Sequence, residues 1–335
     1  MHPALQGLLT IVVGVGGCVG YFYFSNQLLD KVLFKGEGPN AARNITRANM
    51  VRPWLFLFPA FAALSLYLAY PVFETIRLSL TERLPGGESQ FVGLANYQQM
   101  MGEAKFWEAL TNNLLWLLVV PALSTAFGLL AAQLSDRVRW GNVAKSLIFM
   151  PMAISFVGAA VIFKLVYDVR PIDQDQIGVL NALWLTLGGD QPISWLTLPG
   201  WNSFFLMIVL VWIQTGFAMV ILSAALRGIP EETVEAAIVD GATPLQVFFK
   251  IKVPQIMPTI VVVWTTITIV VLKVFDIVFA MTNGQWETQV LANYMYTKMF
   301  VANDWGVGSA SAMVIMLLVS PILVWNVYSA RKEMS

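Results

Sequence analysis

Seven apolar runs, each about twenty residues or longer, dominate this chain of 335 residues. An α-helix needs about twenty apolar residues to cross a hydrocarbon core about 30 Å thick. Inside hydrocarbon the backbone polar groups must be paired within the protein, so such runs fold as helices. The runs cover Ala4–Leu29, Trp54–Phe73, Ala109–Leu134, Val143–Tyr167, Trp201–Leu226, Ile256–Met281 and Ser309–Tyr328. We therefore predict an all-α integral membrane protein with seven transmembrane helices, seated in the lipid bilayer.

Composition supports this prediction and excludes several functions. Hydrophobic residues make up 57% of the chain and charged residues only 12%, against about a quarter in soluble domains. The net charge is zero, so no nucleic-acid partner is expected. The only histidine is His2 and the only cysteine is Cys18, which gives no basis for a metal site, a cofactor or histidine-dependent catalysis. The sequence also has no phosphate-binding Gly-x-x-x-x-Gly-Lys-Ser/Thr loop, so the chain is not expected to be an enzyme that hydrolyses ATP.

Residues 227–258 form a polar interruption between the fifth and sixth runs, and their pattern predicts a helix-turn-helix. Pro230 is expected at the first helical position, followed by two glutamates that the helix dipole favours. Gly241 is expected to end this helix, because glycine tolerates the left-handed conformation. Thr243 can cap a second helix that starts at Pro244, runs to about Val253 and ends at Pro254 and Pro258.

The first of these helices has one narrow apolar face. Val234, Ala237, Ile238 and Gly241 are spaced at i, i+3, i+4 and i+7. Such a thin face suits docking into a groove of another protein. The alternative is an amphipathic helix that lies on the bilayer surface, but those helices are usually basic and this one is acidic.

The loop resembles the EAA loop of ABC importer permeases. The matching residues are Glu235, Ala236, Ala237, Asp240, Gly241, Ala242 and Pro254. In that family the loop is the coupling helix seated in the cytoplasmic ATPase subunit. The resemblance therefore implies that these residues contact an ATPase.

Further segments resemble sugar-importer permeases of the maltose and alpha-glucoside type, from Pro53 to the end of the chain. They include Val92–Tyr97, Phe106–Asn113, Gly178–Asn181, Ile193–Leu196, Arg139–Lys145 and Phe149–Pro151. The resemblance implies a six-helix core at residues 53–335 and an extra N-terminal helix with a linker at residues 1–52. It also implies a second permease subunit, two ATPase subunits, an external sugar-binding protein and a sugar substrate. The large outer domain of maltose permease has no counterpart here, so the binding protein would contact shorter loops.

The basic residues of the connections predict the orientation in a bacterial inner membrane. Thirteen of the twenty Lys and Arg residues lie after the first and third runs, in the 227–258 loop and at the C-terminus. Because basic residues concentrate on the cytoplasmic side, the N-terminus is expected outside and the C-terminus in the cytoplasm.

Polar residues within the fifth and sixth runs are candidates for a substrate path. They are Gln214, Thr215, Gly216, Met219, Lys273 and Asp276. Gly216 corresponds to a sugar-contacting position of the family, whereas Met219 replaces an aromatic residue there. Lys273 and Asp276 are spaced i, i+3 and can pair on one helix face, either as a structural ion pair or as part of the path. If they formed an ion or proton relay, the chain would instead be a secondary transporter.

Overall fold

The computed structural model describes residues 3–35, 37, 39, 41–84, 88–136 and 138–334. Its contacts divide the chain into two compact units, Met1–Glu74 and Thr75–Ser335. Each unit is described by itself below. The expected boundary between residues 52 and 53 rests on a family resemblance and stays a prediction.

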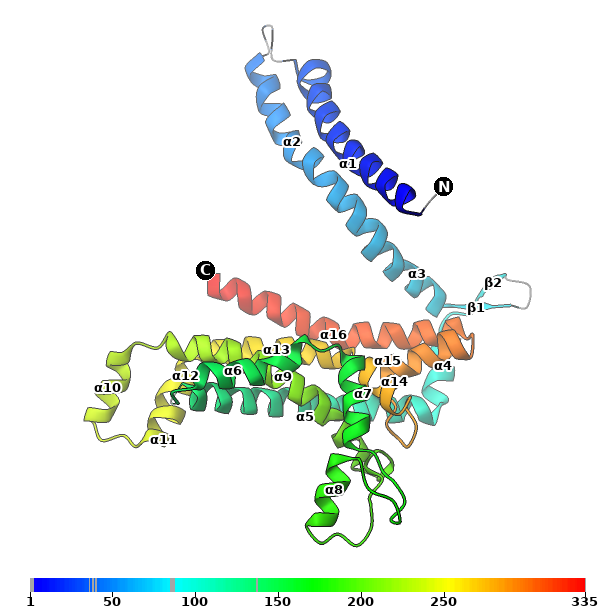
Figure 1. Cartoon of the computed structure of the whole chain (residues 1–335). Coiled ribbons are helices and arrows are strands. Elements are labelled where there is room, and N and C mark those ends of the chain that lie inside the picture. Colours follow the sequence, from blue (N-terminus) through cyan, green and yellow to red (C-terminus); the bar gives the residue numbers. More distant parts are fainter. Residues whose placement is uncertain are drawn as a thin grey trace. The chain divides into compact units, whose positions relative to one another are not determined.

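The first unit is a helical hairpin (Figure 1). Helix α1 (Pro3–Gln27) continues into a π-turn, η1 (Leu28–Leu33). Helix α2 (Ala41–Leu64) runs on through η2 (Ser65–Ala69) into α3 (Tyr70–Ser79). The second apolar run was expected to start at Trp54, but its helix starts at Ala41, so the predicted basic linker is itself largely helical.

The second unit is built around two long parallel helices, α5 (Ala104–Ser135) and α9 (Asn202–Arg227), with α13 (Met257–Leu272) packed against them. Their shared core includes fully buried Trp116, Leu210 and Ile267. A Cβ atom at Gly128 of α5 would lie 2.4 Å from the Cβ of Ala218 in α9. Glycine at this position therefore lets the two helices approach closely, as small residues commonly do between membrane helices.

The fourth predicted span is bent instead of straight. Helix α6 (Gly141–Phe149) and the 3₁₀ turn η3 (Met150–Ala153) meet α7 (Phe156–Val166) at an angle of 106°. Ser155 starts α7, and its hydroxyl accepts a hydrogen bond from the backbone N–H of Gly158 at 3.1 Å. A capping serine directly after a proline-containing turn gives α7 its own start and so allows the change of direction.

The sixth predicted span is also interrupted. The helical segment that ends with α12 (Val253–Gln255) meets α13 at an angle of 71°. Helix α13 stops at Leu272, and α14 (Asp276–Met281) follows after a short non-helical stretch. Within the described residues, five helices are long and apolar enough to span a membrane, or seven if each bent pair is one span. The all-helical membrane fold is confirmed, and the count of seven holds when the bent pairs are included.

Shorter elements cap the two ends of the second unit. The end where α5 begins carries the strands β1 (Thr81–Arg83) and β2 (Ser89–Phe91), α4 (Ala95–Gly102), α15 (Leu291–Tyr296) with η6 (Thr297–Val301), and the start of α16 (Trp305–Met334). Helix α8 (Val179–Thr186) and η4 (Trp195–Thr197) lie in the connection between α7 and α9. The opposite end of the bundle carries α10 and α11, which project from it (Figure 1).

Candidate functional site

The projecting loop begins with helix α10 (Glu231–Val239), which carries Glu231 and Glu232 in its first turn. Pro230 was expected at the first helical position but is the N-cap residue, with ψ of 132°. Its extended conformation keeps it outside the helix, while its carbonyl accepts a hydrogen bond from Thr233 N–H at 3.2 Å. The predicted start is therefore wrong by one residue, and the acidic first turn lies where the helix dipole favours it.

The end of α10 is a Schellman motif centred on Gly241. Gly241 has φ of +84°. Its N–H donates to the carbonyl of Ile238, and the N–H of Ala242 donates to the carbonyl of Ala237, both at 3.0 Å. These two bonds satisfy carbonyls that the helix end leaves free. The predicted role of Gly241 as the left-handed end of the helix is confirmed.

The second helix of the loop starts as predicted but ends later. Thr243 and Gln246 form a capping box at the start of α11 (Pro244–Gln246), with Thr243 N–H donating to Gln246 Oε1 at 2.8 Å. The helix continues through η5 (Val247–Lys252) into α12. Pro254 lies in the first turn of α12, where its missing N–H is tolerated, so it does not end the helix. The bend comes at Ile256, before Pro258.

No residue of α10 is buried. Glu235, Ala236 and Asp240 are exposed, and so is Val239, with 86% of its surface accessible. The apolar face predicted for docking is partly turned inward, because Val234 and Ile238 line a cavity of about 310 Å³ together with Phe248 of the following helix. The exposed large apolar side chains of the loop are those of Ile238, Val239, Leu245, Phe249 and Met257.

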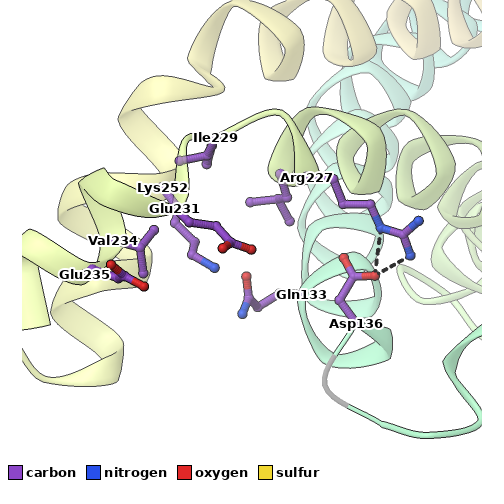
Figure 2. Close-up of a pocket in the computed structure, with 9 residues that line it drawn as sticks. Gln133, Asp136, Arg227, Ile229, Glu231, Val234, Glu235 and Lys252 are labelled. Carbon is purple, nitrogen blue, oxygen red and sulfur yellow. Dashed lines mark hydrogen bonds and ion pairs between the residues drawn. The ribbon is translucent and has the colours of Figure 1, made fainter.

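A second cavity, of about 590 Å³, lies between α10 and the ends of α5 and α9 (Figure 2). Figure 2 shows Glu231 and Lys252 directed into it from the loop, opposite Gln133 and Asp136 of the bundle. Glu235 lines the same cavity at its outer side. The loop is therefore separated from the bundle there by a polar, charged space instead of a packed apolar contact.

Four side chains beside this cavity form the charged cluster: Asp136, Lys145, Ser223 and Arg227. The Oδ1 atom of Asp136 lies 2.6 Å from Lys145 Nζ and 2.7 Å from Arg227 Nη2. Lys145 also donates to the hydroxyl of Ser223 at 2.5 Å. Partial burial of Asp136 disfavours its charged form, but hydrogen bonds and attraction from Arg227 and Lys145 outweigh this effect and hold the pKa of its carboxyl below the usual value.

Sequence reasoning missed the charged cluster as a unit. Lys145 and Arg227 counted only as basic residues that indicate orientation, and Asp136 was not singled out. Asp136 and Arg227 are 91 residues apart, so no local spacing brings them together. The sequence feature that could have pointed to the cluster is Asp136 itself, a single carboxylate just after the apolar run Ala109–Leu134 and followed by basic residues in the same connection.

The candidate path residues of α9 lie in different surroundings. Gln214 is buried, and Met219 is part of the apolar core. The hydroxyl of Thr215 donates to the carbonyl of Val211 at 2.7 Å. A Cβ atom on Gly216 would lie 2.6 Å from the carbonyl oxygen of Ile148, so this glycine lets α6 pack against α9. The assignment of these four residues to a substrate path stays a prediction.

The expected pairing of Lys273 with Asp276 is wrong. Lys273 is the C-cap residue of α13, and Asp276 is the first residue of α14. Because the intervening residues are not helical, the i, i+3 spacing does not put the two side chains on one face. The ion pairs formed by the described residues do not include this one.

At the other end of the unit, asparagines hold the loop between α14 and α15. Asn112 Nδ2 donates to the carbonyls of Glu287 and Gln289, each at 2.8 Å. Asn113 Oδ1 accepts from the N–H of Leu291 at 2.7 Å. Three non-glycine residues of this loop have positive φ, namely Asn283, Trp286 and Glu287. Such a conformation persists only where the surroundings fix it, as these asparagines do.

Residues 124–332 match the family of binding-protein-dependent transport system inner membrane components. Similar proteins include an alpha-glucoside transport system permease protein, AglF, of Rhizobium meliloti, 60% identical over 99% of both chains. The osmoprotective compounds uptake permease protein GgtC of Synechocystis is 46% identical over 82% of this chain and 96% of its own. A solved structure of a bacterial alginate ABC transporter, in complex with a periplasmic protein, has the same fold, with a TM-score of 0.72 and 21% identity over 88% of this chain and 98% of that chain.

Proposed function

Because the chain belongs to the family of binding-protein-dependent transport system inner membrane components, we propose that it is the permease subunit through which α-glucosides enter the cell. As the permease of an ABC importer, it supplies the membrane path, while a separate ATPase subunit hydrolyses ATP and a periplasmic protein binds the solute. Membership of this family removes the rival interpretation as a secondary transporter. The observation that supports the substrate is the 60% identity over the full length of AglF.

Substrate class is tested by uptake into cells that lack the chromosomal gene and carry it on a plasmid. Labelled maltose and labelled cellobiose are a matched pair, because both are glucose disaccharides and differ in the configuration of the glycosidic bond. We expect uptake of maltose that excess unlabelled α-glucosides suppress and excess cellobiose does not. Equal uptake of the two sugars, or uptake of neither, would contradict the α-glucoside assignment.

We further propose that α10 is the coupling helix that contacts the ATPase. Its exposed carboxylate at Glu235 and its exposed apolar residues Ile238 and Val239 support this role, because a projecting helix with uncovered apolar side chains suits binding to a partner. We expect the Glu235 carboxylate to meet a basic groove on the ATPase. Glu235→Lys should abolish sugar uptake, because it would place a positive charge against that groove, whereas Glu235→Gln should retain a large part of the uptake. Unchanged uptake in Glu235→Lys would count against the coupling role.

The complete importer is expected to contain a second permease subunit, two ATPase subunits and a sugar-binding protein. The N-terminus is expected outside and the C-terminus in the cytoplasm, which the distribution of Lys and Arg supports. His2 and Ser335 lie outside the described residues. Tags fused at these two positions test the orientation: the first should be accessible from outside intact cells, and the second only after the membrane is opened. Two cytoplasmic tags would overturn it.

A further inference from the structure

One carboxylate joins the ends of two helices, α5 and α9, to the middle of a third, α6, directly beside the proposed coupling helix. Asp136 follows the last residue of α5, Lys145 lies on α6, and Ser223 and Arg227 lie in the last turns of α9. Asp136 Oδ1 accepts from Lys145 Nζ at 2.6 Å, from Arg227 Nη2 at 2.7 Å and from Arg227 Nε at 3.2 Å. Figure 2 shows the two bonds from Arg227 at the edge of the cavity, across from the side chains of α10.

The two halves of this cluster differ in their exposure. The side chain of Lys145 is 16% exposed and that of Asp136 is 26% exposed, and Lys145 is held further by the hydroxyl of Ser223. The side chain of Arg227 is 61% exposed. A pair shielded from water is weakened less by solvent and salt than an exposed pair. The bond between α5 and α6 is therefore the firm part of the cluster, and the bond to Arg227 is the part that can open and close.

Arg227 is also the residue through which α10 is connected to the bundle. It is the last residue of α9, and only Gly228, Ile229 and Pro230 separate it from α10. The cavity separates α10 from α5 on this side, and most of its lining is charged or polar, namely Gln133, Asp136, Arg227, Glu231, Glu235 and Lys252, with Leu226, Ile229 and Val234. A displacement of α10 would therefore reach the ends of α5 and α9 through the backbone at Arg227 and its ion pair, and would reach α13 separately through η5, against which α10 packs.

We propose that Asp136 is a positioning residue for energy coupling, whose carboxylate holds Arg227 and Lys145 so that displacement of α10 moves α6 and the ends of α5 and α9 together. This inference rests on the proposed role of α10 in contacting the ATPase. The proposed role requires no contact of Asp136 with the sugar or with ATP. Its effect is on how much transport each ATP hydrolysis produces.

The test uses the assembled importer in proteoliposomes with its binding protein and measures sugar imported per ATP hydrolysed. Asp136→Asn keeps the shape of the side chain but removes its charge. Arg227→Gln removes the exposed partner and leaves Asp136 neutralised by Lys145. Each is expected to lower the ratio about tenfold, which corresponds to ~1.4 kcal/mol of lost coupling, while the ATPase subunit still co-purifies. The double variant should be no worse than Asp136→Asn alone, because the ion pair that Arg227→Gln removes is already lost with the charge of Asp136.

Two matched variants separate positioning from a general loss of charge. Arg227→Lys keeps a cation at the same position and should retain at least half of the wild-type ratio. Arg139→Gln removes an exposed charge from the connection that contains Asp136, and it should leave the ratio unchanged. A wild-type ratio in Arg227→Gln would overturn the proposal, and so would additive losses in the double variant or an equal loss in Arg139→Gln.

Glu235→Lys, measured in the same assay, separates the coupling role of α10 from the positioning role of Asp136. If Glu235→Lys uncouples transport but Asp136→Asn and Arg227→Gln do not, the positioning role of Asp136 fails and the coupling role of α10 stands. If all three variants transport normally, the coupling role of α10 fails as well.

Discussion

The hydroxyl of Tyr21 in α1 donates a hydrogen bond to the backbone carbonyl of Leu55 in α2, at 2.9 Å. Leu55 lies four residues before Pro59, which has no N–H and cannot make the helical bond to that carbonyl. In lipid no water is available to replace the missing donor, so a side chain of the neighbouring helix takes its place. This bond joins the two helices of the first unit at the point where the proline weakens one of them.

Tyr21→Phe should therefore loosen the hairpin, because it leaves the Leu55 carbonyl without a donor at a cost of about 1–3 kcal/mol. Pro59→Ala restores the N–H within α2, and in that background Tyr21→Phe should have little effect. Hydrogen exchange of the amides in α1 and α2, measured on the full chain in detergent, compares the four proteins. Equal effects of Tyr21→Phe in the two backgrounds would show that the hydroxyl does not compensate for the proline.

An ion pair joins Glu103, the N-cap residue of α5, to Lys298 in η6, directly after α15. Lys298 Nζ lies 2.5 Å from Glu103 Oε1, and the hydroxyl of Tyr294 donates to Glu103 Oε2 at 2.9 Å. Burial, together with the hydrogen bond to Glu103, raises the pKa of Tyr294 well above its usual value, so this hydroxyl remains a donor at physiological pH. Because both charged side chains are largely shielded from water, this pair should contribute more than an exposed one.

Lys298→Met should lower the stability of the second unit by about 2–4 kcal/mol, since it leaves the Glu103 carboxylate with one remaining partner in a shielded position. Glu103→Gln should cost less, because its amide oxygen can still accept from Lys298 while its NH2 group can donate to the hydroxyl of Tyr294. Lys105→Met is the matched control: Lys105 pairs with Glu108 but is 57% exposed, so its loss should change stability by less than about 1 kcal/mol. Thermal unfolding of the detergent-solubilised proteins ranks the three, and an equal shift for Lys298 and Lys105 would contradict the prediction.

A substitution at Gly216 can decide whether glycine is needed there for the packing of α6 against α9 or for contact with the substrate. An alanine Cβ there would lie 2.6 Å from the Ile148 carbonyl oxygen and 3.0 Å from the Phe149 Cα, and neither backbone atom can move away cheaply. Gly216→Ala should therefore destabilise the protein by about 1–3 kcal/mol. Gly14→Ala in α1 is the control, because no described atom lies within 4 Å of its added methyl group. A stable Gly216→Ala protein with impaired uptake would favour the substrate path instead.

Structural features that depend on neighbouring residues were predicted well from the sequence. Features that depend on contacts between distant residues were not. Gly241, Thr243 and Pro244 each act on neighbouring residues, and the helix end and capping box lie where those residue types predict them. Hydropathy located the apolar runs, but it does not respond to a cap such as Ser155 inside an apolar run. The span expected at Val143–Tyr167 is therefore bent, and the span expected at Ile256–Met281 is interrupted after Leu272. The charged cluster could not be predicted, because it depends on how α5 and α9 pack.

The conformation of Gly241 gives the sharpest test of the loop. A Cβ there would have no described atom within 4 Å, so a side chain would not clash with the second helix of the loop. Only the backbone opposes it: φ of +84° is unfavourable for an L-residue by roughly 1–2 kcal/mol, and more for a β-branched one. Asparagine tolerates this conformation better than other non-glycine residues, although it is larger than alanine.

We therefore expect sugar uptake to fall in the order glycine, asparagine, alanine, valine at position 241. Gly241→Val should abolish it, because the Schellman motif that sets the direction of α11 relative to α10 is lost. A steric clash would instead rank the variants by size, with alanine tolerated and asparagine not. Uptake by the four proteins at matched membrane levels, together with ATP hydrolysis stimulated by the loaded binding protein, decides between the two orders. Wild-type uptake in Gly241→Val would show that the geometry of this turn is not needed for coupling.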